Sequence, residues 1–346
     1  MAEIGWDVGG AHVKACLVER GTVQDAAQWP CPLWQGLQHL DAALTRARER
    51  WSVAFDRIER HAVTMTGEMT DLFPTRRDGV LGLATHLSQA LGPRMVLWAA
   101  GAPRWVAPAD ADARWAAIAS ANWLATATWA ARTAGDGVLV DIGSTTTDLI
   151  VLKGGVPVPQ GISDAQRLAT GELVYLGVVR TPLCALARHV PFAGAEVNVM
   201  NEFFATSADV FRLTGELPPA HDQQPGADGG GKDPRATRQR LARMIGRDEH
   251  EAAPAEWRAL ARFWRDEVLQ QIAQQLSRVT AAASLPADAP IVACGSGAFL
   301  ATDLARVTGR PLRRFADLVP LADASLAGWV TVCAPAAAVA LLATRP

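Results

Sequence analysis

The chain has 346 residues, of which 49% are hydrophobic and 20% are charged. This balance is typical of a globular protein, and the length is sufficient for two domains. The formal net charge is −2 and no block of lysine and arginine stands out, which argues against a nucleic-acid partner. The five cysteines are scattered without a C-x-x-C pair, so we expect buried free thiols in a reducing cytosol, with neither a zinc site nor a disulfide framework.

The N-terminus opens directly into a strand-like stretch and lacks the basic and apolar regions of a signal peptide. The longest charge-free apolar runs, near 116–131 and 329–344, are shorter than a membrane span. We therefore expect a cytoplasmic protein without a membrane partner; the sequence leaves the oligomeric state open.

The first part of the chain alternates strand and helix character. Strands are expected at 3–9, at 12–18, after the Arg20-Gly21 turn, at 61–66 and at 95–100. Helices are expected at about 35–52, at 79–91 and at 111–133. The last of these is predicted to be one long buried helix, because it contains neither Pro nor Gly and is rich in Ala and Trp.

The opening pattern then recurs at a constant offset of 134 residues, when 5–21 is aligned with 139–155. Both copies read as a strand, a D-x-G turn, a strand, a Gly turn and a strand. A repeat of this length indicates a duplicated supersecondary unit, and hence two similar lobes. The matched pairs are Asp7 with Asp141, Gly9 with Gly143, Gly10 with Ser144, Lys14 with Asp148, and Gly21 with Gly155.

The repeat predicts two domains. The first lobe is expected at 1–133, completed by a C-terminal helix at 330–346, and the second at 134–329 with an insertion at about 163–260. Residues 217–234 are rich in Pro, Gly and Asp, which predicts a mobile loop with a possible role as a lid. Helices are expected at 255–283 and 334–343, and 290–300 reads as a strand, a Gly-rich turn and the start of a helix.

The two D-x-G turns form a candidate phosphate site. Glycines let the backbone bend tightly and bring N–H groups against phosphate oxygens, and an aspartate at the preceding strand end can hold Mg²⁺. Singly, each turn is an ordinary β-turn and Lys14 a solvated side chain; together with the repeat they favour phosphate binding. We predict Asp7 and Asp141 as metal ligands, Lys14 and Asp148 as groups that tune the charge, and phosphate contacts from Gly9, Gly10, Gly143, Ser144, Thr145 and Thr146.

At these residues the chain resembles the acetate/sugar kinase, Hsp70 and actin superfamily. The two hairpins look like its two phosphate motifs, and Gly295-Ser296-Gly297 within 290–300 looks like its adenosine motif. The resemblance implies an α/β fold of two RNase-H-like lobes around a central cleft, the actin-like ATPase fold. It also implies Mg²⁺ as cofactor, with ATP as a further ligand of the site.

Other segments narrow the family. TMTGEMTDLFPTRRDGV (64–80) resembles the hydantoinase A and oxoprolinase group, ATP-using enzymes that act on cyclic amides. The segments 119–127, 167–186 and 226–248 are similar to a branch linked to tetrahydromethanopterin-dependent one-carbon metabolism, whose archaeal members act in methanofuran biosynthesis. This resemblance implies a transferase that joins an aminomethylfuran-methyl diphosphate to the phenol of γ-glutamyltyramine and releases diphosphate. The implied partners are therefore small molecules, a furan diphosphate and a tyramine derivative.

Five further residues are weaker substrate candidates, each with an ordinary structural explanation. Glu68 and Asp71 are suited to accept a phenolic proton or hold an amine, but an exposed loop or helix cap explains them as well. Asn122 either faces the cleft or bonds between helices. Glu172 and Arg180 either contact substrate or form an internal salt bridge.

Two other functions remain open. An ATP-dependent kinase or amidohydrolase is favoured by the Gly295-Ser296-Gly297 motif, because a diphosphate substrate needs no adenosine pocket. A nucleotide-binding regulator is the second alternative, although nothing after residue 300 resembles a partner-binding domain.

Overall fold

The computed structural model describes residues 2–55, 57–102 and 104–344, so the last two residues of the predicted C-terminal helix lie outside the described part. The chain divides into two compact units. Unit 1 comprises Met1–Leu139, Ile150–Arg167 and Arg313–Pro346, and unit 2 comprises Val140–Leu149 and Leu168–Leu312.

Unit 1 is built on a six-stranded mixed sheet with the order β3-β2-β1-β4-β5-β6. The first three strands form an antiparallel meander, and β4 and β5 then run parallel to β1. The expected strands are thus confirmed, with bounds of Ala2–Val8 (β1), His12–Glu19 (β2), Thr22–Pro30 (β3), Arg60–Met65 (β4), Met95–Trp98 (β5) and Trp105–Val106 (β6).

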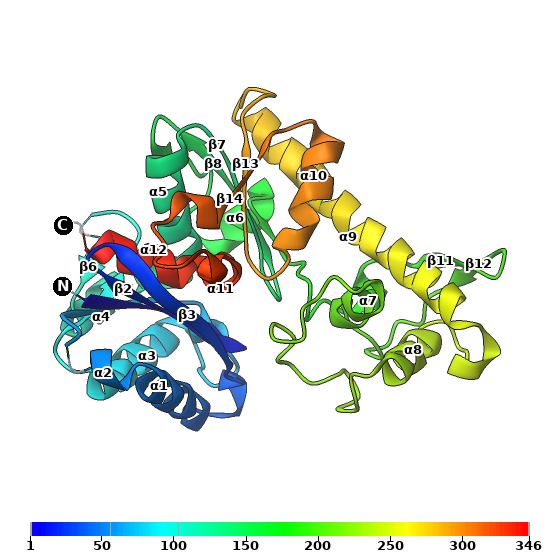
Figure 1. The fold of residues 1–346 in the computed structure, drawn as a ribbon, viewed down its shortest axis with the longest axis horizontal. Coiled ribbons are helices and arrows are strands. Elements are labelled where there is room, and N and C mark those ends of the chain that lie inside the picture. The colour runs from blue at the N-terminus through cyan, green and yellow to red at the C-terminus, as the bar shows by residue number, and fades with distance from the viewer. Residues whose placement is uncertain (1, 56, 103, 345–346) are drawn as a thin grey trace. The chain divides into compact units, whose positions relative to one another are not determined.

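Helices cover both faces of this sheet (Figure 1). Alternate residues of β1 pack with α1 (Gln38–Arg50) and α3 (Arg76–Leu91) in one hydrophobic core, as the two-residue period of a strand dictates. On the other face lies the alanine-rich α12 (Ala334–Ala343), where a Cβ on Gly5 would come 2.0 Å from the Ala336 carbonyl oxygen. Gly5 is therefore what allows α12 to lie directly on the strand. The short helices α2 and α11 span Ser52–Phe55 and Ala327–Val332.

The prediction of one helix over 111–133 was wrong. The structure has two helices, α4 (Ala111–Ile118) and α5 (Asn122–Ala134), separated by a short break. Ser120 in this break has a φ of 48°, in the left-handed region that L-residues rarely adopt. The absence of Pro and Gly does not by itself keep a helix continuous, because non-local contacts can hold a single residue out of helical geometry.

The second sheet repeats the opening pattern with the order β10-β8-β7-β13-β14, and β9 pairs with β8. The copied hairpin is present, although its third strand contains only two residues. Pro157 lies in that strand and Pro159 follows it, and proline supplies no N–H to a strand ladder. The bounds are Gly137–Ile142 (β7), Thr147–Lys153 (β8), Val156–Pro157 (β9), Leu173–Val174 (β10), Ile291–Cys294 (β13) and Leu312–Arg314 (β14).

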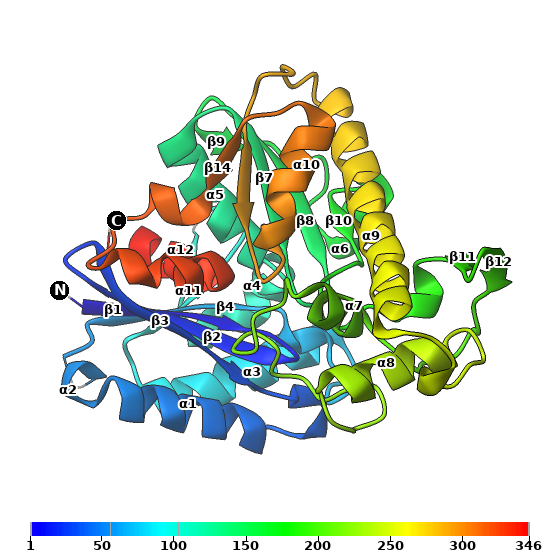
Figure 2. The ribbon, with the colours of Figure 1, turned by 45° about the vertical axis from the view of Figure 1, so that its right-hand side comes forward.

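The long helix α9 (Pro254–Ala282) organises unit 2 (Figure 2). Pro254 occupies its first turn, and the Glu256 carboxylate accepts a hydrogen bond of 2.9 Å from the Ala253 N–H. This confirms the helix expected at 255–283. The other helices and the small hairpin are α6 (Asp164–Thr170), α7 (Ser207–Thr214), α8 (Pro234–Arg243), α10 (Ala301–Thr308), β11 (His189–Phe192) and β12 (Ala195–Asn198).

The segment between α7 and α8 contains no helix or strand up to residue 233, as its composition predicted. It is anchored nonetheless, because the buried Asp222 accepts hydrogen bonds from Arg212 (2.6 Å) and Lys232 (3.2 Å). Beside it, Arg240 pairs with Asp209 at 2.8 Å, and both side chains are fully buried. A role of this loop as a lid stays a prediction.

Across the described ranges, no single helix has the length and apolar character to cross a membrane. One helix pair, Ala324–Val332 and Ala334–Ala343, meets the criterion jointly by length and composition, with a bend of 105° between its members.

Candidate functional site

The first D-x-G turn connects β1 and β2 and is held by backbone hydrogen bonds. Gly9 N donates to His12 O at 2.9 Å, which closes the turn. Two later segments donate to the carbonyls of the same turn: Leu33 N to Gly10 O at 3.0 Å, and Thr66 N to Val8 O at 2.9 Å.

The second turn, between β7 and β8, has the same bonds at the same offset. Gly143 N donates to Thr146 O at 2.8 Å, and Gly297 N donates to Ile142 O at 2.8 Å. The Ser144 carbonyl, which corresponds to that of Gly10, accepts from Val179 N at 3.0 Å and from Arg180 N at 2.9 Å. The structure therefore confirms the duplicated hairpin at the level of single hydrogen bonds.

The second turn is suited to bind an anion. Its carbonyls are occupied by the donors of 178–180, whereas the N–H groups of Ser144, Thr145 and Thr146 donate to no acceptor in the described part of the chain. These three residues are partly exposed. Successive backbone N–H groups without an internal acceptor form a concavity for phosphate oxygens, as the sequence predicted for this turn.

Gly177 is needed for this arrangement and was missed from sequence. A Cβ at this position would lie 2.5 Å from Ser144 C and Thr145 N, and 2.7 Å from Gly143 O. Only a glycine lets the 177–180 segment approach the turn closely enough to bond to its carbonyls. The signal was present in TGELVYLGVVRTP, but a lone glycine between apolar residues does not say what it approaches.

Carboxylates flank both turns. Asp7, Asp141 and Asp148 are all at least 91% buried, since none exceeds 9% exposure. Lys14 faces Asp7 across the β1–β2 ladder, with its Nζ 3.8 Å from Asp7 Oδ2. The repeat places Asp148 where the first hairpin has Lys14. The first hairpin thus carries a neutralised carboxylate and the second carries two acidic positions.

The donor set of the second hairpin fits Mg²⁺. Within the described ranges no group of three or more His, Cys, Asp and Glu is placed to hold a metal. Mg²⁺ needs no such group, because it commonly takes one or two carboxylates and completes its shell with water and substrate phosphate. Asp141 is the better of the two predicted ligands, since Lys14 already compensates Asp7. The two aspartates belong to different units, and their joint use of one metal stays a prediction.

The Gly295-Ser296-Gly297 turn after β13 lies against the second hairpin. Gly295 has a φ of 88°, and a Cβ there would come 2.2 Å from Ile142 O and 2.4 Å from Asp141 Oδ1. A glycine is therefore required both by the backbone conformation and by the space beside Asp141. A short 3-10 turn, Ala298–Leu300, follows and leads into α10, as expected for the 290–300 segment.

A polar cluster in unit 1 surrounds Glu68, one of the weaker candidates. Glu68 lies in the 3-10 turn Gly67–Met69 after β4 and is 1% exposed. Its Oε1 accepts from Ser120 Oγ at 2.7 Å and from Arg76 Nη2 at 3.1 Å. Burial is the largest influence on its pKa and outweighs these donors, so the pKa of Glu68 is raised. Ser120 and Arg76 were missed from sequence because they come from segments far from Glu68 in the chain.

The remaining candidates have ordinary surroundings. Asp71 is exposed. Asn122 is the first residue of α5 and not an interior one, and its Oδ1 accepts from Trp123 N at 2.8 Å, so the predicted bond between helices was wrong. Glu172 is buried and accepts from Thr170 Oγ1 at 2.9 Å. Arg180 has an exposed side chain, and its backbone N–H is one of the donors to Ser144.

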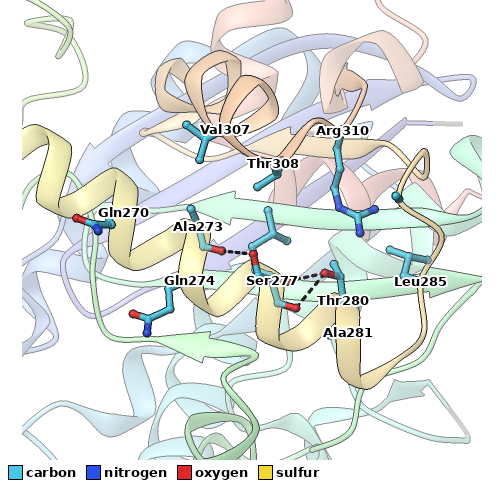
Figure 3. Close-up of a pocket in the computed structure, with 12 residues that line it drawn as sticks. Gln270, Ala273, Gln274, Ser277, Thr280, Ala281, Leu285, Val307, Thr308 and Arg310 are labelled. Carbon is cyan, nitrogen blue, oxygen red and sulfur yellow. Dashed lines mark hydrogen bonds between the residues drawn. The ribbon is translucent and has the colours of Figure 1, made fainter.

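A surface pocket of about 540 Å³ lies elsewhere in unit 2 (Figure 3). It is lined by the α9 residues around Ser277 and by the segment that follows α10. Its one charged group, Arg310, donates to the carbonyls of Pro286 and Ala289 at 2.7 and 3.0 Å. None of the predicted site residues lines this pocket.

Solved structures share this architecture. A PilM–PilN complex of type IV pilus biogenesis matches with a TM-score of 0.53 and 13% identity, over 99% of this chain and 98% of that one. A ROK family glucokinase from Streptomyces griseus, determined with glucose and AMPPNP, matches with a TM-score of 0.50 and 14% identity over the full length of both chains. The chain has the actin-like ATPase fold predicted from its twin hairpins.

Sequence comparison then gives the family. The model for hydantoinase/oxoprolinase matches residues 59–312, well over half of the chain, and the chain belongs to this family. A curated relative from Methanocaldococcus jannaschii is 27% identical over 277 residues, covering 80% of this chain and 81% of the relative. Its name describes a synthase of a furan-2-yl methanamine that bears a γ-glutamylaminoethyl phenoxymethyl group. A protein of the same name from Methanococcus vannielii is 41% identical over 73 residues, 21% of this chain and 32% of that one.

Proposed function

We propose that this chain is an ether-forming transferase of methanofuran or methylofuran biosynthesis. It joins an aminomethylfuran-methyl diphosphate to the phenol of a tyramine derivative such as γ-glutamyltyramine, and it releases diphosphate. The observation that carries the proposal is the relationship over four fifths of both chains to a synthase whose name specifies a phenoxymethyl furan.

The chemistry needs a site that stabilises a leaving diphosphate. The C–O bond of the furan-methyl carbon breaks with its electron pair going to diphosphate, the phenol oxygen bonds to that carbon, and the phenolic proton is released. Backbone N–H groups aimed at developing negative charge lower the barrier of such a step. The turn at 143–146, whose N–H groups have no acceptor among the described residues, supplies this kind of donor.

Mg²⁺ fits the proposal as the cofactor, with Asp141 as its first ligand and Asp7 as the second. Bound there, it would neutralise charge on the diphosphate. The protein's own contribution is to hold the diphosphate oxygens through Ser144, Thr145 and Thr146, and to keep the carboxylate of Asp141 beside them. Asp148 is suited to orient a water of the metal shell, and Lys14 to balance the charge of Asp7.

An ATP-dependent kinase or amidohydrolase is the second candidate. The observation that favours it is the Gly295-Ser296-Gly297 turn, which lies against Asp141 although a diphosphate substrate has no adenosine to place there. Hydrolysis of Mg·ATP to ADP in the presence of an amide or alcohol, without coupling of the furan diphosphate, would establish this alternative.

The deciding experiment incubates the enzyme with Mg²⁺, the furan diphosphate and γ-glutamyltyramine. We expect the ether product by mass spectrometry and diphosphate in a one-to-one ratio with it. Asp141→Asn should abolish turnover and leave the thermal unfolding midpoint within a few degrees of wild type. Gly328→Ala, at a position where a Cβ meets nothing within 4 Å, serves as the control variant and should keep full activity. Full activity of Asp141→Asn would refute the metal role of Asp141.

A further inference from the structure

The turn after β4 in unit 1 corresponds to the Gly-Ser-Gly turn after β13 in unit 2. Thr66 N donates to Val8 O as Gly297 N donates to Ile142 O, and the two acceptors are related by the offset of 134 residues. β4 pairs with β1 as β13 pairs with β7. The two turns therefore hold equivalent places in the two sheets, but their residues differ: the turn of unit 1 carries a carboxylate, Glu68, beside the first phosphate turn.

Only one oxygen of this carboxylate is engaged. Oε1 accepts both Ser120 Oγ and Arg76 Nη2, and Arg76 Nη2 also donates to Ser120 Oγ at 2.8 Å. Oε2 is buried and accepts no hydrogen bond from any residue within the described ranges. Buried carboxylate oxygens nearly always have a partner, so an oxygen left without one marks a place where a ligand donor fits.

The surroundings fix Glu68 in place. Gly79 of α3 lies so close that a Cβ there would come 2.3 Å from the Glu68 carbonyl oxygen, which locks the turn against the helix. Ser120 is held at a φ of 48° in the break between α4 and α5, and this strained backbone positions its hydroxyl on Oε1. Strain of this kind clusters at functional sites, because surrounding contacts must maintain it.

The charges around Glu68 are already balanced. Arg76 also contacts Asp164 Oδ2 at 3.2 Å, and Arg167 lies 3.9 Å from the same carboxylate while its guanidinium stacks over the Trp123 ring at 4.1 Å. Two carboxylates thus face two guanidinium groups. A neutral hydroxyl donor fits the unpaired oxygen without adding charge, whereas an ammonium group would leave one positive charge in excess.

We propose that Glu68 is the catalytic base that accepts the hydroxyl proton of the aromatic acceptor, with Ser120 and Arg76 as its positioning residues. This inference rests on the proposed function. In the step, the phenol O–H bond breaks and its proton passes to Glu68 Oε2, the phenol oxygen forms the bond to the furan methylene, and diphosphate leaves with the electron pair of the broken C–O bond.

Two further observations agree with this role. Burial raises the pKa of Glu68, which makes it a stronger proton acceptor than a solvated carboxylate. Met69, next in the chain, is 50% exposed and its Sδ lies 3.8 Å from Ser120 Oγ. An exposed thioether beside the carboxylate offers a favourable contact to the edge of an aromatic ring.

The test compares Glu68→Gln with wild type on two acceptors, the tyramine derivative and a ring-fluorinated analogue whose phenol is about two pKa units more acidic. General-base catalysis contributes about 10²–10⁴-fold. We expect Glu68→Gln to lose about that factor in kcat on the ordinary acceptor and markedly less on the acidic one, because the acidic phenol needs the base less. Asp71→Asn, an exposed acidic neighbour, is the matched control and should match wild type on both.

The outcomes separate the two proposals. If wild type couples neither acceptor, the proposed function fails, whatever Glu68 does. If wild type couples both and Glu68→Gln is equally impaired on both, or unimpaired, then Glu68 is not the base. If Glu68→Gln does not fold, as judged by its unfolding transition, Glu68→Asp provides the same comparison with a displaced carboxylate; equal losses on both acceptors again contradict the inference.

Discussion

Replacing Gly177 by alanine tests the geometry of the second phosphate turn. The new Cβ would lie 2.5 Å from Ser144 C and Thr145 N, where ordinary contact begins at 3.4 Å. The turn and the 177–180 segment must therefore separate by about 0.9 Å, the difference of these two distances. All the atoms in conflict belong to the backbone, so no side-chain rotation relieves the clash.

The magnitude follows from packing and hydrogen bonding. Overpacking costs about 1–3 kcal/mol. The three backbone bonds from residues 178–180 to Gly143 and Ser144 would weaken, each worth about 1 kcal/mol. Restricting the unfolded chain returns about 0.4–1 kcal/mol. We expect a net destabilisation of roughly 2–4 kcal/mol, which lowers the unfolding midpoint by about 2–4 °C for each kcal/mol. Because a displacement near 1 Å can cost 100-fold, diphosphate affinity should fall by about one to two orders of magnitude.

Differential scanning calorimetry and titration with Mg-diphosphate measure both effects. Gly328→Ala is the control, since its Cβ would meet nothing within 4 Å. A Gly177→Ala protein with wild-type midpoint and wild-type diphosphate affinity would refute the role of this approach. Loss of stability with unchanged affinity would mean that the turn at 143–146 does not bind the diphosphate.

Three further predictions concern titratable groups. Burial acts to raise the pKa of Asp25, but hydrogen bonds from Arg50 and Trp51 outweigh it and lower the pKa. The stabilisation is thus present above the unfolded pKa and lost as the pH falls through the folded one; Asp25→Asn should lower the melting temperature at pH 7 and match wild type by about pH 2 in acid unfolding. The pKa of Glu68 is raised by burial, so its charged form destabilises the fold once the pH exceeds the folded pKa. Glu68→Gln should therefore melt at a higher temperature than wild type at pH 8, with no gain at pH 4; a lower melting temperature at pH 8 would contradict this sign. Of the five free cysteines only Cys184 is partly exposed, so a thiol reagent should modify one residue in the native protein and five in denaturant; rapid native labelling of several would contradict the burial of the others.

The twin hairpins were recognisable from sequence because their determinants are local. A strand, a D-x-G turn and a second strand are specified by neighbouring residues, and the offset of 134 residues reveals the duplication. The same holds for α9 and α12, whose apolar spacing and absence of interior breakers define them within one or two residues. The glycine-rich turn after β13 was also predicted in the right place.

Other features arise from contacts between distant segments. The break at Ser120 interrupts a sequence that reads as helical, because that serine bonds to Glu68, 52 positions earlier in the chain. The importance of Gly177 becomes visible only when the atoms of the second turn are placed against it. The same is true of Gly5, which admits α12 from the far end of the chain.

The sequence alone determined the fold class, the family and the two turns, because short-range backbone preferences and apolar periodicity encode them. Only the tertiary structure decided which polar groups meet: that Arg76 and Ser120 occupy one oxygen of Glu68 while the other accepts nothing among the described residues, and that Lys14 lies beside Asp7. Burial and hydrogen-bond partnership depend on packing across dozens of residues, and no spacing along the chain reports them.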